Sequence, residues 1–106
     1  MSELIVYDAA GVFLSQFLVH EACRFAWIKG GRPAELRAHE TTMRAFWDLL
    51  GLGKDLQVNP YNAPKAGTAF GQLDMIFSED LETTEARILS FSGVVLVRIT
   101  NLRIPE

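Results

Sequence analysis

The sequence predicts an α+β fold with the element order β-α-α-β-β-β, in which an αα-hairpin covers one face of an antiparallel sheet. Two stretches with apolar residues at helical spacing lie in the first half of the chain. Three strand-like runs follow in the second half, and consecutive strands favour antiparallel pairing. Because 106 residues leave room for only one core, we expect residues 1–106 to form a single domain.

The first half of the chain supplies one predicted strand and two predicted helices. Residues 3–8 hold a β-branched and aromatic run that ends at Asp8, which indicates a strand. The apolar spacing is helical over residues 10–29, and the following Gly-Gly-Arg-Pro is typical of a helix end. A second helix is predicted over residues 33–50, where apolar residues recur every three or four positions. These two helices are expected to form the hairpin.

The second half of the chain begins with a predicted loop and continues with three strands. Residues 54–72 show no clear period and contain several prolines and glycines, and loops of this length are often functional. The strands are predicted at residues 73–77, 86–91 and 94–102. Ser92 and Gly93 can form the turn between the last two strands. The place of the N-terminal strand in the sheet is left open by this pattern.

The charge of the chain is acidic overall and unevenly distributed. A formal net charge of -3 argues against direct binding of nucleic acid, which needs clustered Lys and Arg. Residues 24–44 hold five bases and two acids, whereas residues 74–85 hold five acids and no base. The acidic run is either a solvated strand edge or a surface that binds a basic partner. Its candidate partner-binding residues are Glu79, Asp80 and Glu82.

Cysteine usage and hydropathy favour a cytoplasmic protein. The single Cys23 cannot form an internal disulfide, and no secretory signal is recognisable at the start of the sequence. The longest mainly apolar stretch, residues 9–28, is interrupted by polar and charged side chains, which argues against a membrane span.

The first predicted helix has two different faces. The face expected to pack on the sheet consists of Val12, Leu14, Leu18, Val19, Ala22, Cys23, Phe25 and Ala26. The opposite side mixes large apolar residues with polar ones, and this composition is enriched at protein interfaces. Either the second helix covers this side, as for a buried helix, or a protein partner does. The candidate partner-binding residues of this helix are Phe13, Phe17, His20, Arg24 and Trp27, and Tyr61 of the long loop joins them.

Residues with catalytic or metal-binding chemistry are few. His20, Cys23 and His39 are potential ligands, but no paired spacing repeats, so the sequence predicts no metal site. No recognisable nucleophile motif surrounds Cys23 or the hydroxyl groups, so we predict no catalytic residue and no cofactor.

The sequence therefore favours a non-enzymatic protein-interaction module. Such a module is either homo-oligomeric, as in a homodimer, or a small inhibitor or adaptor that binds a larger protein. It would bind through the aromatic side of the first helix, through the acidic strand region, or through both. Two alternatives stay open: a structural subunit of a phage or other large assembly, which needs two contact surfaces, and a small hydrolase or transferase that uses His39 or Cys23.

Overall fold

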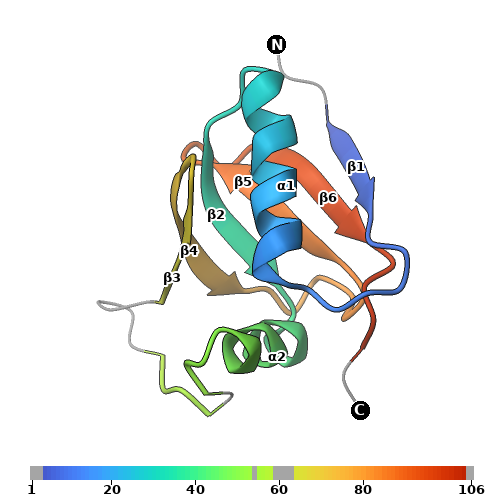
Figure 1. Ribbon diagram of the computed structural model, residues 1–106, viewed down its shortest axis with the longest axis vertical. Helices are drawn as coiled ribbons and strands as arrows, with labels where there is room; N and C mark the ends of the chain where they lie inside the picture. Colours follow the sequence, from blue (N-terminus) through green and yellow to red (C-terminus); the bar gives the residue numbers. More distant parts are fainter. Residues whose placement is uncertain (1–3, 54, 59–63, 105–106) are drawn as a thin grey trace.

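The computed structural model describes residues 4–53, 55–58 and 64–104, which form two helices and one six-stranded sheet (Figure 1). In chain order the elements are β1 (Ile5–Asp8), α1 (Gln16–Ile28), β2 (Pro33–Ala38), α2 (Glu40–Leu49), β3 (Lys65–Thr68), β4 (Gly71–Phe77), β5 (Ala86–Ser90) and β6 (Val95–Thr100). The α+β class predicted from the sequence is confirmed. Among the described residues, neither helix has the length and apolar character needed to span a bilayer.

The sheet is mixed, so the prediction of an antiparallel sheet is wrong. The strand order is β1-β6-β5-β2-β4-β3. Strands β5 and β6 pair antiparallel, as do β2 with β5 and β3 with β4. The pairs β1 with β6 and β2 with β4 are parallel. The N-terminal strand, whose place the sequence left open, is an edge strand next to the C-terminal one.

The predicted αα-hairpin is also wrong, because residues 33–38 form the strand β2. Leu36 and Ala38 are buried in the core, whereas Glu35 and Arg37 point to the other side of the sheet, which is the two-residue period of a strand. Pro33 stands at the first position of the strand, where a missing N–H is tolerated. Pairing with β4 and β5 outweighs the weak helix preference of this segment. Only the second part of the predicted helix, α2, is helical.

The first helix begins later than its apolar spacing predicts. Residues 10 and 11 have positive φ angles, which carry the chain from the edge strand toward the helix. The helix starts after Ser15, whose hydroxyl accepts a hydrogen bond from the Leu18 N–H at 3.3 Å. It ends at Ile28, before Gly30 and Gly31, and the Gly31 N–H donates to the Ala26 carbonyl at 2.8 Å, as in a Schellman motif.

The predicted loop at residues 54–72 contains an unforeseen strand. Residues 65–68 form β3, which pairs with the start of β4 as an edge hairpin. Residues 54 and 59–63 lie outside the described part of the chain, and with them the predicted partner-binding residue Tyr61.

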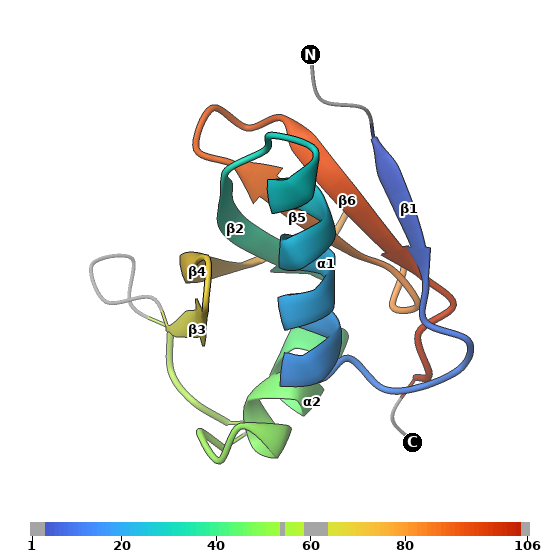
Figure 2. The same ribbon diagram turned by 45° about the horizontal axis from the view of Figure 1, so that its top comes forward.

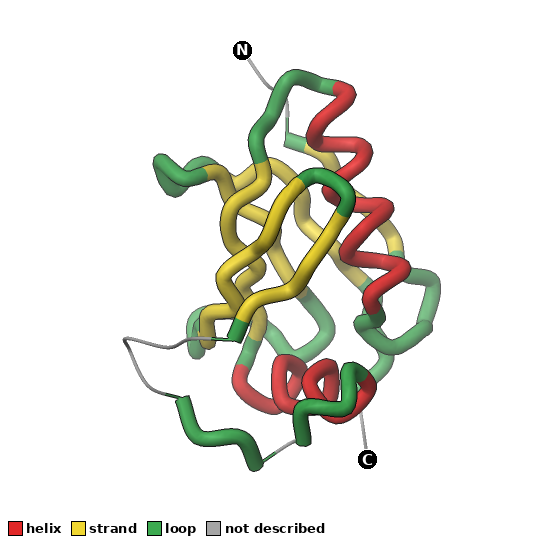
Figure 3. The backbone as a smooth tube through the Cα atoms, turned by 60° about the vertical axis from the view of Figure 1, so that its left-hand side comes forward, coloured by secondary structure: helices red, strands yellow, loops and turns green. Residues whose placement is uncertain are grey.

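The core lies between the sheet and α1, and α2 closes it at one end (Figure 2). The sheet-facing side of α1 is the one predicted: Leu18, Val19, Ala22, Cys23 and Ala26 are buried. Two residues predicted for this face differ, because Val12 precedes the helix and is exposed, and Phe25 is half-buried. From α2, Met43, Phe46 and Trp47 enter the same core. Figure 3 shows α1 running along the sheet, with α2 below it at the end of the sheet.

Candidate functional site

The side of α1 that faces away from the sheet is uncovered. Phe17 is 69% exposed and Ile28 is 64% exposed, although both belong to a helix whose other side is core. No described helix or strand lies in front of α1 in Figure 1. The alternative in which the second helix covers this side is therefore wrong for Phe17 and Ile28, because α2 packs against β2 and β4 instead.

Four residues form one line along this side, which we call the outer stripe. They are Phe17, Glu21, Arg24 and Ile28. Their spacing of four, three and four residues keeps them on one side of a helix. The Arg24 Nη2 donates to the Glu21 Oε2 at 3.0 Å, and both side chains are partly exposed. The outer stripe is thus apolar at both ends and carries an ion pair in its middle.

An aromatic cluster borders the outer stripe on the side of the β3–β4 hairpin. The Phe70 ring lies 5.4 Å from the His20 ring and 5.6 Å from the Trp27 ring, measured between ring centroids. The Arg32 guanidinium sits 4.1 Å from the centre of the Trp27 ring, close enough for a cation–π contact. We call His20, Trp27, Arg32 and Phe70 the aromatic flank. Trp27 remains 40% exposed in it.

Phe13, a further candidate from the sequence, lies apart from the outer stripe. It precedes the first turn of α1, and the Arg103 guanidinium lies 5.1 Å from the centre of its ring. Together with Phe46 and Leu49 of α2 it lines a small pocket. For this one residue the second helix does supply part of the cover.

The acidic candidates Glu79, Asp80 and Glu82 are exposed in the loop between β4 and β5. This loop lies at the end of the sheet where α2 packs, because the Thr42 hydroxyl donates to the Thr83 carbonyl at 2.6 Å. The Leu102 N–H donates a hydrogen bond to the carbonyl of Thr84, the next residue of this loop, at 3.0 Å. The structure therefore places the acidic residues on a surface separate from the outer stripe.

The face of the sheet opposite α1 carries a row of three arginines that the sequence analysis did not identify. Arg37, Arg87 and Arg98 are direct cross-strand partners on β2, β5 and β6. Glu85 binds the last two, with distances of 2.7 Å to the Arg87 Nε and 2.6 Å to the Arg98 Nη2. Glu35 pairs with Arg37 at 3.0 Å. Because these carboxylates offset the repulsion within the row, we assign it a structural role.

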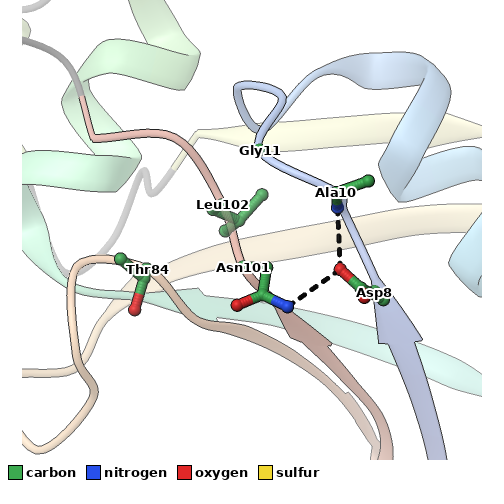
Figure 4. A pocket seen from close by; sticks show the side chains of 6 residues that line it. All are labelled: Asp8, Ala10, Gly11, Thr84, Asn101 and Leu102. Carbon is green, nitrogen blue, oxygen red and sulfur yellow. Dashed lines mark hydrogen bonds between the residues drawn. The ribbon is translucent and has the colours of Figure 1, made fainter.

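An open pocket of about 410 Å³, lined by both polar and apolar residues, lies where β1 and β6 end (Figure 4). The Asp8 carboxylate accepts hydrogen bonds from the Ala10 N–H at 2.8 Å and the Asn101 Nδ2 at 3.0 Å. These two bonds hold the pKa of Asp8 below its ordinary value. Ala10 and Asn101 both have positive φ angles, which the hydrogen bonds between the two strand ends maintain. The polar groups of this pocket thus stabilise the turns that follow β1 and β6.

Cys23 and His39, which were considered for catalysis or metal binding, have structural roles. Cys23 is fully buried, and this burial, opposed by a hydrogen bond from Thr68, raises its pKa to about 12. His39 precedes α2, and its Nδ1 accepts a hydrogen bond from the Thr41 N–H at 3.2 Å as a helix cap. Within residues 4–53, 55–58 and 64–104, no group of three or more His, Cys, Asp or Glu side chains is placed to hold a metal ion.

The structure brings Phe17, His20, Arg24 and Trp27 onto one surface, as the helical period indicated. It adds Glu21 and Ile28, whose places in the stripe follow from the same period. It also adds Phe70 and Arg32, for which the local sequence holds no signal, because their contacts depend on how the hairpin and the end of α1 fold back.

Comparisons of the chain with protein-family models, with curated proteins and with solved structures find no match. What the protein does is therefore inferred from its own residues.

Proposed function

We propose that this protein is a non-enzymatic protein-interaction module that binds a protein partner through the outer stripe and the aromatic flank of α1. The observation that carries this proposal is the exposure of Phe17 and Ile28 on a helix with a fully formed core on its other side. Removing large apolar side chains from water is the main favourable contribution to protein association.

The residue types of this surface also support a protein partner. Trp and Arg are the residues most enriched among those that dominate binding energy, and here Arg32 stacks on Trp27. The contacts with Phe70 and Arg32 hold the Trp27 ring in place before any partner arrives. A side chain that is already ordered loses less entropy on binding.

The non-enzymatic part of the proposal is supported by the two residues on which an enzyme would depend. A cysteine acts as a nucleophile in its thiolate form, and a pKa of about 12 keeps the Cys23 thiol protonated at neutral pH. The Nδ1 atom of His39 accepts a hydrogen bond from the Thr41 N–H, so this side chain caps the start of α2.

A cross-linking experiment in the native host tests the proposal. A tagged wild-type chain is expressed there, cross-linked in the cells and purified, and its linked proteins are identified by mass spectrometry. We expect at least one linked protein, further copies of the chain included, that is lost in the Phe17→Asp variant. A buried Asp at the interface would lose its hydration without gaining a partner.

The matched control is Phe91→Asp. Phe91 is 94% exposed in the turn between β5 and β6, so it offers the same substitution away from the outer stripe. We expect this variant to keep the linked protein, and circular dichroism to show that both variants fold. The proposal is wrong if the wild type links to no protein, if Phe17→Asp keeps the wild-type set, or if Phe91→Asp alone loses it.

A further inference from the structure

The chemical types along the outer stripe follow a symmetric order. From the N-terminal end the stripe reads apolar, acidic, basic, apolar: Phe17, Glu21, Arg24, Ile28. The outer pair and the inner pair are both centred between residues 22 and 23. A two-fold axis through that point would place an antiparallel second copy so that each Phe17 meets Ile28 and each Glu21 meets Arg24.

We propose that the outer stripe binds the outer stripe of a second copy of this chain in an antiparallel, two-fold symmetric dimer. This inference rests on the proposed function and names the partner of the same surface. A two-fold interface requires a surface that is complementary to itself, and the stripe meets this requirement in both charge and hydrophobicity. A parallel arrangement would instead set Glu21 against Glu21 and Arg24 against Arg24.

The spacing of the stripe suits a helix pair. Steps of four, three and four residues are those of the apolar seam along which two helices pack at small crossing angles. The helix has 13 residues and is about 20 Å long, so its four stripe residues can all contact an antiparallel neighbour. Phe17 and Ile28, at the two ends of the stripe, are the apolar anchors. The charges between them determine that the two helices run antiparallel.

The ion pair within one chain does not oppose this arrangement. Glu21 and Arg24 are partly exposed, so their mutual contact contributes little to the stability of the monomer. In the dimer the two acids and two bases can form a network of four alternating charges. Because the surface is small compared with a standard protein interface, we expect a weak dimer that dissociates on dilution.

Charge variants studied by sedimentation velocity test this inference. We expect the wild type to pass from monomer to dimer between micromolar and millimolar concentration. The Glu21→Arg variant carries two bases in its stripe and the Arg24→Glu variant two acids, so each alone repels its own copy. Like charges at an interface are strongly unfavourable, and we expect each variant to dimerise at least about tenfold more weakly.

The decisive sample is an equimolar mixture of these two variants. A stripe with two acids complements a stripe with two bases in the antiparallel arrangement, so the mixture is expected to form heterodimers at concentrations where each variant alone is monomeric. Phe17→Asp, which leaves the two charges in place, is also expected to be monomeric. The control Glu79→Arg, in the exposed β4–β5 loop, is expected to dimerise like the wild type.

Three results would overturn the inference: a wild type that stays monomeric up to millimolar concentration, single charge variants that dimerise like the wild type, or a mixture that stays monomeric. A monomeric wild type that still links, through Phe17, to another protein in the host would refute the dimer and keep the proposed function. A wild type that stays monomeric up to millimolar concentration and links to no protein in the host would refute both. Because the substituted side chains are all at least partly exposed, circular dichroism of each variant is expected to match the wild type.

Discussion

Replacing Trp47 with alanine is expected to lower the free energy of unfolding by about 3–5 kcal/mol, the usual cost of removing a large aromatic side chain from a core. Trp47 is fully buried in α2, and its ring centroid lies 5.1 Å from that of Phe77 on β4. Its indole N–H points at the Met75 sulfur, 3.3 Å away. The Trp47 side chain thus joins α2 to the sheet.

Urea unfolding followed by circular dichroism measures this loss, and thermal unfolding is expected to show a midpoint lower by more than about 10 °C. The matched control is Leu49→Ala, because Leu49 lies two residues further along α2 and is 62% exposed. We expect a change of at most about 0.5 kcal/mol for this control. Equal losses for the two variants would contradict the packing of α2 against β4.

Replacing Glu85 with glutamine is expected to lower the free energy of unfolding by about 1–2 kcal/mol at neutral pH. Two hydrogen bonds between charged groups would contribute more in a buried site, but both arginines are partly exposed to water. The Glu85 side chain is only 12% exposed and binds Arg87 and Arg98, which face each other across β5 and β6. Glutamine carries no charge, so the repulsion between the two guanidinium groups is no longer offset.

The effect of Glu85 depends on pH in a direction that the structure fixes. Burial acts to raise the pKa of Glu85, but the hydrogen bonds and charges of Arg98 and Arg87 outweigh it and lower this pKa below its ordinary value of 4.5. A carboxyl whose pKa is lower in the folded state stabilises the fold above its ordinary pKa and loses that contribution as the pH falls through the folded value.

The difference in unfolding free energy between the wild type and Glu85→Gln is therefore expected to be constant near neutral pH and to shrink below about pH 4.5. Urea unfolding at a series of pH values measures it. The variant Glu82→Gln, exposed in the same loop, is the control and should follow the wild type within about 0.5 kcal/mol. A difference that grows toward low pH would contradict the role assigned to Glu85.

The parts of the fold that follow from local periodicity were predictable. The core side of α1 shows the helical period over its whole length, and β5 and β6 are separated by a glycine turn with Gly93 at a φ of 87°. Strand β2 was not predictable in this way. Its six residues precede α2, and their apolar positions match the helical spacing of α2. Only its pairing with β4 and β5 decides its structure.

The short strand β3 illustrates the same limit. Its residues Lys65–Thr68 include Ala66 and Gly67, which have little preference for a strand, and pairing with β4 alone makes them one. The candidate site likewise has a part that the sequence predicts and a part that it does not. Phe17, Arg24 and Trp27 follow from the helical period, whereas the position of Phe70 depends on a contact between segments more than forty residues apart.

The most direct test of the self-complementary outer stripe is an isotope-filtered nuclear Overhauser experiment on a mixture of labelled and unlabelled chains. Within one helix Phe17 and Ile28 are separated by about 16 Å, too far for a cross-peak. We predict a cross-peak between the Ile28 methyl groups of one copy and the Phe17 ring of the other, at a concentration where the protein sediments as a dimer. A dimeric sample that lacks this cross-peak, or that shows Phe17 of one copy against Phe17 of the other, would contradict the antiparallel interface.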